Sequence, residues 1–371
     1  MNNNQKEKLK KLYQYKGEKW NKICKNFPKL PSILPAVRRI IVFGDVHGDM
    51  DVVLKSLQVA NLINKHYIYD KNNLPKWTGG DTVVVQLGDQ IDSCRFDPTT
   101  LQPCKFIKKD GDKANDTNIL ELFTHLHNEA QKKLGAVYSI LGNHELMNAK
   151  GNMDYVSQEN INEFSEFNTS ENNELESIDN SLLNRKKLFS PGNKWANFLG
   201  CTRQVAMQIG SNLFTHAGIV FELAKKYKIE DINVIMSNYL WNNFDNLKIK
   251  ESDFLEIFSD KSNGPSPLWN RIYGREFSNK LGRCSDFIDE NDGKFKLSKL
   301  EGYKGYNNIF PVGRILVGHT PQLNQEMQLR CNNKIGLLDY GSSQAFNKFK
   351  NSNVPIHVLQ ILNDNDVSIL Q

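Results

Sequence analysis

Short apolar runs that end at a glycine alternate with stretches of helical spacing in the N-terminal part of the chain. Three runs rich in β-branched residues predict buried strands, and they cover residues 40–42, 82–87 and 136–141. Apolar residues at helical spacing lie between these runs, over residues 51–62 and about 118–134. This alternation predicts parallel strands joined by crossover helices.

Later apolar runs predict a second sheet. Two short runs, 204–209 and 212–215, are separated by a Gly-Ser pair and predict a hairpin. Helical spacing over residues 182–199 and 221–258 predicts helices on either side of this hairpin. Further strands are predicted at residues 314–317, 334–338, 356–362 and 367–370.

The composition is that of an ordinary soluble globular protein. Hydrophobic residues make up 39% and charged residues 24% of the 371 positions, and no apolar run is long enough to span a bilayer. The polar, basic N-terminus lacks the apolar core of a signal peptide, so we expect a cytoplasmic location. The net charge of +5 is small and the lysines are scattered, which argues against a nucleic-acid partner.

Polarity along the chain indicates where the domain begins and where it carries insertions. Residues 1–36 are expected to form a basic, frayed N-terminal arm, and residues 37–371 a single domain. Polar insertions are expected near residues 96–116 and 158–181, the second of them solvated. A helical and loop-rich cap that controls substrate access is expected near residues 221–310.

The cysteines show no pairing motif. No CxxC occurs among the six, which are Cys24, Cys94, Cys104, Cys201, Cys284 and Cys331. Neither a structural zinc site nor a secreted disulfide framework is therefore indicated, and free thiols are expected. A redox-sensitive pair between Cys94 and Cys104 is the alternative.

Polar side chains able to bind metal ions follow the predicted strands. They are Asp45, His47, Asp89, Asp92, Asn143, His144, His216 and His319. Strand ends of an open α/β sheet are where ligands collect, and a close pair of metals needs a bridging carboxylate with separate ligands for each ion. The sequence therefore predicts a two-metal site. The other histidines are expected to be structural or surface residues, and they are His66, His125, His127 and His357.

Five of these segments also match known motifs. In chain order they are GDVHGD at 44–49, GDQID at 88–92, GNHE at 142–145, HAG at 216–218 and GHT at 318–320. Together they resemble the calcineurin-like metallophosphoesterase superfamily. A narrower resemblance, to the Shewanella-like protein phosphatases, rests on LGNHELMN at 141–148, PLWNR at 267–271 and VGHTPQ at 317–322. It implies an α/β (α+β) fold in which two mixed β-sheets pack face to face, with helices outside.

The resemblance also implies a ligand set for two metal ions, which are Mn, Fe or Zn. It implies that the first ion is held by Asp45, His47 and Asp89. It implies that the second is held by Asp89, Asn143, His216 and His319, with Asp89 bridging. A hydroxide shared by the metals would attack phosphorus directly, and His144, oriented by Asp92, would protonate the leaving oxygen.

Phosphate binding is where the chain departs from the family pattern. The family places an Arg directly after the second Asp of GDxxD, whereas this chain has Ser93 there and Arg95 two positions later. A bidentate Arg suits phosphate recognition. We expect Arg271, in PLWNR, to be the better candidate for this role, and Arg95 to be a second one.

The implied activity is that of a metal-dependent phosphoprotein phosphatase, acting on phospho-Ser/Thr or phospho-Tyr. Two alternatives stay open at the level of the sequence. One is a hydrolase of diadenosine polyphosphates or small phosphoesters, because the same metal centre cleaves those bonds. The other is a catalytically silent scaffold, which is disfavoured because every ligand position holds a competent residue.

Overall fold

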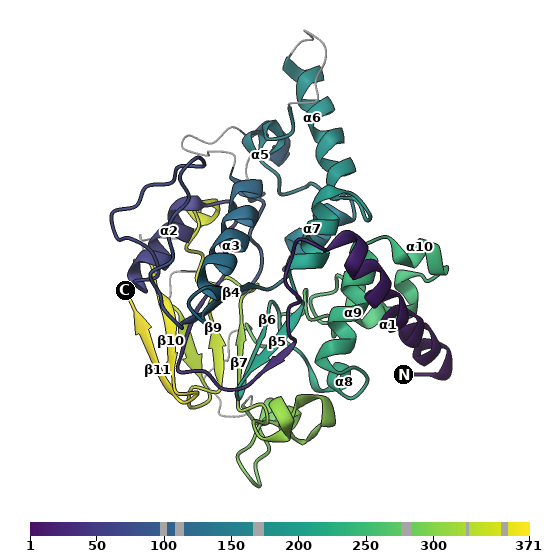
Figure 1. Ribbon diagram of the computed structural model, residues 1–371, viewed down its shortest axis with the longest axis vertical. Coiled ribbons are helices and arrows are strands. Elements are labelled where there is room, and N and C mark those ends of the chain that lie inside the picture. The colour runs from purple at the N-terminus through teal and green to yellow at the C-terminus, as the bar shows by residue number, and fades with distance from the viewer. Residues whose placement is uncertain (97–101, 108–114, 166–173, 276–283, 324–325, 350–354) are drawn as a thin grey trace.

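Two β-sheets stacked against each other form the centre of the molecule (Figure 1). The computed structural model describes residues 1–371 except 97–101, 108–114, 166–173, 276–283, 324–325 and 350–354. The five-stranded sheet has the order β11-β10-β2-β3-β4, and the six-stranded sheet has the order β1-β5-β6-β7-β9-β8. Both sheets mix parallel and antiparallel pairs, as predicted.

The five-stranded sheet contains the predicted parallel unit. Its strands are β2 (Arg39–Phe43), β3 (Val83–Gln86), β4 (Ala136–Ser139), β10 (Val358–Leu362) and β11 (Asp366–Leu370). β2, β3 and β4 are parallel neighbours in register, so their carboxyl ends lie at one edge. The C-terminal strand β10 pairs antiparallel with β2, which places it in the first sheet and not in the second.

The six-stranded sheet holds the hairpin and most of the later strands. Its members are β1 (Ile33–Leu34), β5 (Ala206–Ile209), β6 (Asn212–Thr215), β7 (Arg314–Val317), β8 (Gln328–Arg330) and β9 (Ile335–Leu337). β6, β7 and β9 are parallel neighbours, and their carboxyl ends carry further predicted site residues. The two short strands β1 and β8 were not predicted from the sequence.

Helices cover the outer faces of both sheets (Figure 1). Those of the described residues are α1 (Asn3–Ile23), α2 (Met50–Val59), α3 (Asp116–Gln131), α4 (Asn143–Ala149), α5 (Gln158–Asn162), α6 (Glu174–Phe189), α7 (Lys194–Thr202), α8 (Phe221–Ala224), α9 (Ile229–Leu240), α10 (Asn243–Leu247), α11 (Leu255–Phe258) and α12 (Cys284–Phe287). In the described ranges, no helix combines the length and apolar character needed to cross a bilayer.

Alternation along β2 shows how the layers are built. Ile40 and Val42 pack between the two sheets with side chains of the second sheet, whereas Ile41 and Phe43 pack against α2 and α3. Successive strand residues point to opposite faces, so a strand that is buried on both faces is apolar at every position. Each such side chain contributes about 1.5 to 3 kcal/mol of burial free energy.

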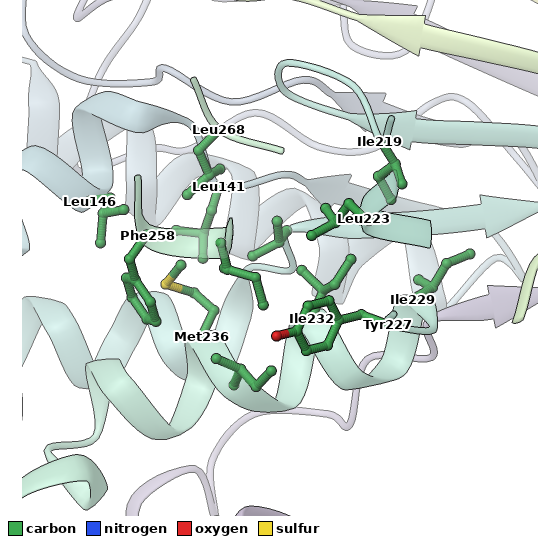
Figure 2. Packing of buried hydrophobic residues seen from close by; sticks show 14 of the residues in the cluster. Leu141, Leu146, Ile219, Leu223, Tyr227, Ile229, Ile232, Met236, Phe258 and Leu268 are labelled. Carbon is green, nitrogen blue, oxygen red and sulfur yellow. The ribbon is translucent and has the colours of Figure 1, made fainter. Parts of the chain in front are cut away.

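A third core cluster lies on the outer face of the second sheet (Figure 2). Ile232 and Met236 of α9 lie in the same cluster as Leu141 and Leu146, which flank the GNHE segment. Residues of α9 are almost all buried, and the helix contacts α1, α7 and β5. This helix therefore belongs to the core, and the core that it completes supports one of the site segments. A cap formed by residues near 221–310 stays a prediction.

The N-terminal segment differs from the predicted frayed arm. α1 begins with a capping box at Asn2 and buries Leu9, Leu12 and Trp20. Tyr13 donates its hydroxyl proton to Asp231 of α9 at 2.8 Å. An amphipathic helix that buries one face is stabilised by that packing, so the prediction of a frayed, solvated arm is wrong.

The second predicted insertion is also more ordered than a solvated segment. Residues 166–173 lie outside the described residues, but α5 and α6 flank them. Ile161 of α5 and Ile178 of α6 are buried together with Met153 and Val156. The sparse apolar residues of this segment were enough to fix two helices, because they form a small core of their own. The first insertion, near 96–116, lies partly outside the described residues.

All six cysteines are paired, so the prediction of free thiols is wrong. The bonds are Cys24–Cys201, Cys94–Cys104 and Cys284–Cys331. Disulfides persist mainly in oxidising compartments, so their presence does not favour the predicted cytoplasmic location, which stays a prediction. The first bond ties the end of α1 to α7, and the second closes the loop that follows Asp92.

Candidate metal centre and active site

The predicted metal-binding residues gather where strands of the two sheets end. Asp45 and His47 follow β2, Asp89 follows β3, Asn143 begins α4 after β4, and the remaining pair, His216 and His319, follow β6 and β7. All of these side chains are buried. We call Asp45, His47 and Asp89 the first-metal side, and Asp89, Asn143, His216 and His319 the second-metal side.

Backbone conformation marks the same loops. Four predicted site residues have φ angles in the left-handed region, namely His47 (43°), Asp89 (50°), Asp92 (72°) and His319 (66°). Residues other than glycine rarely adopt such backbone angles. Each one that does costs about 1 to 3 kcal/mol of strain. Such strain is typical of functional sites, where the surrounding structure over-determines the backbone.

Asp89 lies at the centre of the group. Its Oδ2 is 3.3 Å from His216 Nε2, 3.8 Å from His144 Nε2 and 3.9 Å from His47 Nε2. Burial would raise the pKa of Asp89, but the neighbouring imidazoles hold it well below its usual range. Gly142 is required beside it, because a Cβ there would lie 2.1 Å from Asp89 Oδ1. Asp89 is thus the one carboxylate shared by both sides, as predicted for a bridging ligand.

Each of the three predicted histidine ligands is anchored by one ring nitrogen. The N–H groups donate to backbone carbonyls, in the pairs His47 Nδ1 with Ile91 (3.3 Å), His216 Nδ1 with Leu87 (2.8 Å) and His319 Nε2 with Trp269 (3.0 Å). This is how metal-binding histidines are oriented in proteins, since it fixes the ring and directs the other nitrogen at the ion.

On the second-metal side, the remaining nitrogens converge on Asn143. Its Oδ1 lies 2.9 Å from His216 Nε2 and 2.9 Å from His319 Nδ1. The amide oxygen of Asn143 is an acceptor. When the other nitrogen of each ring carries the proton, the nitrogen that faces Asn143 presents a lone pair, and a cation between these atoms satisfies all three. Ligands about 2.1 Å from a common ion at right angles are about 3 Å apart, so this spacing fits a metal ion.

On the first-metal side, Asp45 is held by the loop that carries His319. The backbone N–H of His319 donates to Asp45 Oδ2 at 3.0 Å, and Asp45 Oδ2 lies 3.9 Å from His47 Nε2. A Cβ on Gly318 would lie 2.0 Å from Asp45 Oδ1, so only glycine allows this approach. Strands of two different sheets are thereby joined at the site.

Asp339 is a buried acid that the sequence analysis missed. It follows β9, and its Oδ2 has no hydrogen-bond partner among the described residues. Burial raises the pKa of Asp45 well above its usual range, and the nearby Asp339 and Asp89 raise it further. Three buried carboxylates in one place need compensating cations, which also fits a metal centre. Its position before a strand-end glycine, Gly341, was the signal that could have identified it.

His144 and Asp92 form the predicted acid pair. His144 Nδ1 donates to Asp92 Oδ2 at 2.8 Å, and its Nε2 faces Asp89. Asn148, in the same helix as His144, donates to both oxygens of Asp92 at 3.0 and 2.9 Å. The imidazole is therefore fixed in one orientation, with its free nitrogen toward the metal centre.

Glu145 fastens two of the site loops together. It is fully buried and accepts hydrogen bonds from the backbone N–H groups of Gly142 (2.6 Å), Gln90 (2.7 Å) and Asp89 (3.2 Å). Buried hydrogen bonds to a charged acceptor each contribute about 1.5 to 3 kcal/mol. Glu145 lies within the GNHE motif, but its role could not be predicted, because Gln90 and Asp89 lie 55 and 56 positions away in the chain.

Both predicted phosphate-binding arginines reach the centre, on different sides. Arg95 Nη1 donates to the backbone carbonyls of Asp92 (3.2 Å) and Cys94 (2.7 Å), and Nη2 lies 2.5 Å from His47 Nε2, the ring nitrogen that a metal ion would bind in place of this contact. The guanidinium lies against the rings of Tyr155 and Phe346. Arg271 donates from Nη1 to the backbone carbonyl of His319 at 2.9 Å. Each guanidinium has further N–H groups in its planar fork, which suits an oxyanion.

Comparison with known proteins identifies the family. A sequence model described as calcineurin-like phosphoesterase matches residues 38–323. The chain belongs to the calcineurin-like phosphoesterase family. It is a metal-dependent phosphatase, and divalent metals are the cofactors of this family.

Relatives of this phosphoesterase come from a virus and from plants. An uncharacterized protein, R398, of Acanthamoeba polyphaga mimivirus is 36% identical over 259 residues, which cover 65% of this chain and 94% of the relative. Shewanella-like protein phosphatase 2 of Arabidopsis thaliana is 24% identical over 334 residues, which cover 83% of this chain and 72% of that protein.

The fold is shared with a solved bacterial phosphatase. The structure of a cold-active protein-tyrosine phosphatase of a psychrophilic Shewanella species matches with a TM-score of 0.58 at 20% identity, over 92% of this chain and 83% of that chain. This match confirms the predicted arrangement of two mixed sheets with flanking helices.

A cavity opens beside the first-metal side of this phosphoesterase. Its volume is about 260 Å³, and its lining includes His47, Ser93, Tyr67, Tyr69 and Gln344. Mixed apolar and polar walls next to reactive groups are typical of substrate sites. The second-metal side does not contribute to this lining.

The histidines predicted to be structural lie away from the centre. His125 Nε2 donates to the carbonyl of Pro75, and His127 Nδ1 to that of Val137. His66 is exposed, and His357 is buried against Tyr340. None of these four belongs to the groups of donors that converge in the described residues.

Proposed function

We propose that this phosphatase hydrolyses phosphomonoesters of phosphorylated proteins at a two-metal centre. The observation that carries the proposal is the convergence of two donor groups on Asp89, one with His47 and His144 and the other with His216 and His319. Asp92 holds the ring of His144. A metal centre alone fits many reactions, but a fixed imidazole 3.8 Å from the bridging carboxylate adds an acid for the leaving group.

The metal ligands in this proposal are the predicted ones. One ion is held by Asp45, His47 and Asp89, and the other by Asp89, Asn143, His216 and His319. Mn, Fe or Zn suits this mixture of carboxylate, amide and imidazole donors. When bound, the two ions supply Lewis acidity, which neutralises phosphate charge and lowers the pKa of coordinated water.

The protein's own groups do the remaining work. Asp92 holds the Nδ1 proton of His144, so that Nε2 faces the reacting ester and delivers its proton to the leaving oxygen. Arg95 lies beside His47 and Arg271 beside His319, and both bind non-bridging phosphoryl oxygens through charge-assisted hydrogen bonds. The cavity beside His47 receives the part of the substrate that leaves.

Support for a phosphoprotein substrate comes from relatives. The proteins of Arabidopsis thaliana and Plasmodium berghei that match over more than four fifths of this chain are called Shewanella-like protein phosphatases. The alternative substrate class is diadenosine polyphosphates or other small phosphoesters, because the same centre cleaves such bonds. A silent scaffold is the third alternative.

Three substrates distinguish these functions. Metal is stripped from the protein and Mn²⁺ is restored, and hydrolysis of matched phosphotyrosine and phosphothreonine peptides is compared with that of diadenosine tetraphosphate. Asp89→Asn is the control, since it removes the shared charge. Peptide turnover that disappears in the control supports the proposal. Turnover of the dinucleotide alone favours the small-molecule alternative, and no turnover with metal bound favours the scaffold.

A further inference from the structure

Arg185 is a buried cation that lies outside every recognised motif. It is near the C-terminal end of α6, a helix that projects from the body of the molecule (Figure 1). Its side chain is 0% exposed. A charge that is removed from water requires specific partners, so the identity of those partners indicates what the residue does.

Its guanidinium contacts the acid pair from the side opposite His144. Nη2 donates to Asp92 Oδ1 at 3.0 Å and to Asp116 Oδ2 at 2.8 Å. Nε donates to Asn148 Oδ1 at 2.9 Å, and Nη1 to the carbonyl of Asn160 at 3.1 Å. Four of the five N–H groups of the guanidinium are thus engaged, in a planar arrangement that a Lys ammonium cannot reproduce.

Aromatic rings hold the guanidinium in place. The ring centroids of Phe164 and Phe189 lie 5.3 and 5.2 Å from Arg185 Cζ. Rings at this distance favour a cation and leave it little freedom to move. The position of Arg185 is therefore fixed by packing as well as by charge.

The contacts divide the oxygens of Asp92 between two partners. Oδ1 accepts from Arg185, whereas Oδ2 accepts from His144 Nδ1. Asn148 links the same groups, because its Oδ1 accepts from Arg185 while its Nδ2 donates to Asp92. These bonds together fix the plane of the carboxylate, with one oxygen toward Arg185 and the other toward His144.

We propose that Arg185 is a positioning residue for the His144–Asp92 pair. It holds the carboxylate of Asp92 in one orientation, so that His144 remains directed at the leaving oxygen. The inference rests on the proposed function, in which His144 is the acid. It assigns a catalytic consequence to a helix that belongs to the insertion between the GNHE and HAG motifs.

A purely structural role is the competing explanation. The Arg185–Asp116 ion pair also joins α6 to the start of α3, and its loss would loosen that junction. Glu163, at the end of α5, also braces the start of α3, since it accepts from the backbone N–H groups of Asp116 (2.8 Å) and Thr117 (3.0 Å). Asp92 is not among the partners of Glu163, so Glu163→Gln is a matched control.

The test compares two esters that differ in their need for an acid. Phenyl phosphate has a poor leaving group, and p-nitrophenyl phosphate a good one that leaves without protonation. We expect Arg185→Gln to lower kcat for phenyl phosphate about 10- to 100-fold, as outer partners of catalytic groups do, and kcat for p-nitrophenyl phosphate less than about 3-fold. Arg185→Lys should give an intermediate ratio, and Glu163→Gln the wild-type ratio.

Equal losses on both esters in Arg185→Gln, or a ratio that Glu163→Gln reproduces, would overturn the proposal. If Arg185→Gln does not fold, Arg185→Lys decides alone, and an unchanged ratio in that variant overturns it. A crystal structure of the better-folded variant provides a test without turnover. Loss of the 2.8 Å His144–Asp92 contact supports positioning, and its retention contradicts it. A wild type that hydrolyses neither ester refutes the proposed function, and the crystal structure then tests Arg185 separately.

Discussion

The two sides of the metal centre differ in how closely their donors are gathered. On the second-metal side, Asn143 Oδ1 is 2.9 Å from one nitrogen of each of His216 and His319. One N–H of Arg271 donates to the backbone carbonyl of His319. This side is compact and already has the spacing that a metal ion requires.

The first-metal side is more open. His47 Nε2 is 3.9 Å from the carboxylates of both Asp45 and Asp89, and Arg95 lies against it. His47 lines the cavity, and the ring of His144 is 4.9 Å from that of His47. From this difference we infer that the substrate binds and its leaving group is protonated on the first-metal side. The second-metal side mainly retains the metal.

On the first-metal side, loss of the acid function should lower kcat more than any other change. In Asp92→Asn the carboxylate that holds His144 Nδ1–H is replaced by an amide. We expect kcat for phenyl phosphate to fall about 10²- to 10³-fold, within the range of general acid catalysis, while kcat for p-nitrophenyl phosphate changes little. Metal content, measured by elemental analysis, should stay unchanged. A loss of equal size on both esters would show that Asp92 is structural.

The arginines test the comparison directly, since one belongs to each side. Arg95→Lys removes a bidentate donor next to the cavity, and we expect KM for a phosphopeptide to rise about 10-fold. Arg271→Lys should raise it less, about 3-fold, because Arg271 lies beside His319, which does not line the cavity. Steady-state kinetics of both variants supplies the measurement. Equal effects would remove the distinction between the sides.

Removal of two disulfides is expected to change KM least. Cys94–Cys104 closes a short loop next to Arg95, and Cys24–Cys201 closes one of 177 residues far from the centre. Replacing either pair with serines should lower the free energy of unfolding by about 2 to 5 kcal/mol. We expect only the Cys94/Cys104 variant to raise KM, by a few-fold. Denaturant unfolding and kinetics on both variants measure this, and a KM change in the Cys24/Cys201 variant would contradict it.

Much of the fold was predictable because its signals are local. The apolar runs of β2, β3 and β4 and the polar residues behind them are short segments, so pattern and position were enough to predict a strand edge with metal ligands. The bounds of β6 and β7 agree with the predicted ranges, 212–215 and 314–317. The match to the family confirms the fold that the motifs implied.

The remainder depends on contacts between distant parts of the chain. Arg185 meets Asp92 across 93 positions, and Cys24 meets Cys201 across 177. The polar composition around α6 indicates solvent exposure, and only the folded chain shows that this helix delivers a buried cation to the acid pair. The lysine-rich α1 was misjudged for the same reason, since its buried face has few residues and its partner is α9.

The central claim is that Asp89 is shared by two metal ions. Calorimetric titration of the metal-stripped protein with Mn²⁺, carried out on the wild type and on Asp89→Asn, tests it most directly. The account predicts two ions per wild-type chain, and weakened binding of both ions in the variant, because both lose the charge of one carboxylate. A single ion in the wild type, or a variant in which one site keeps its full affinity, would contradict the account.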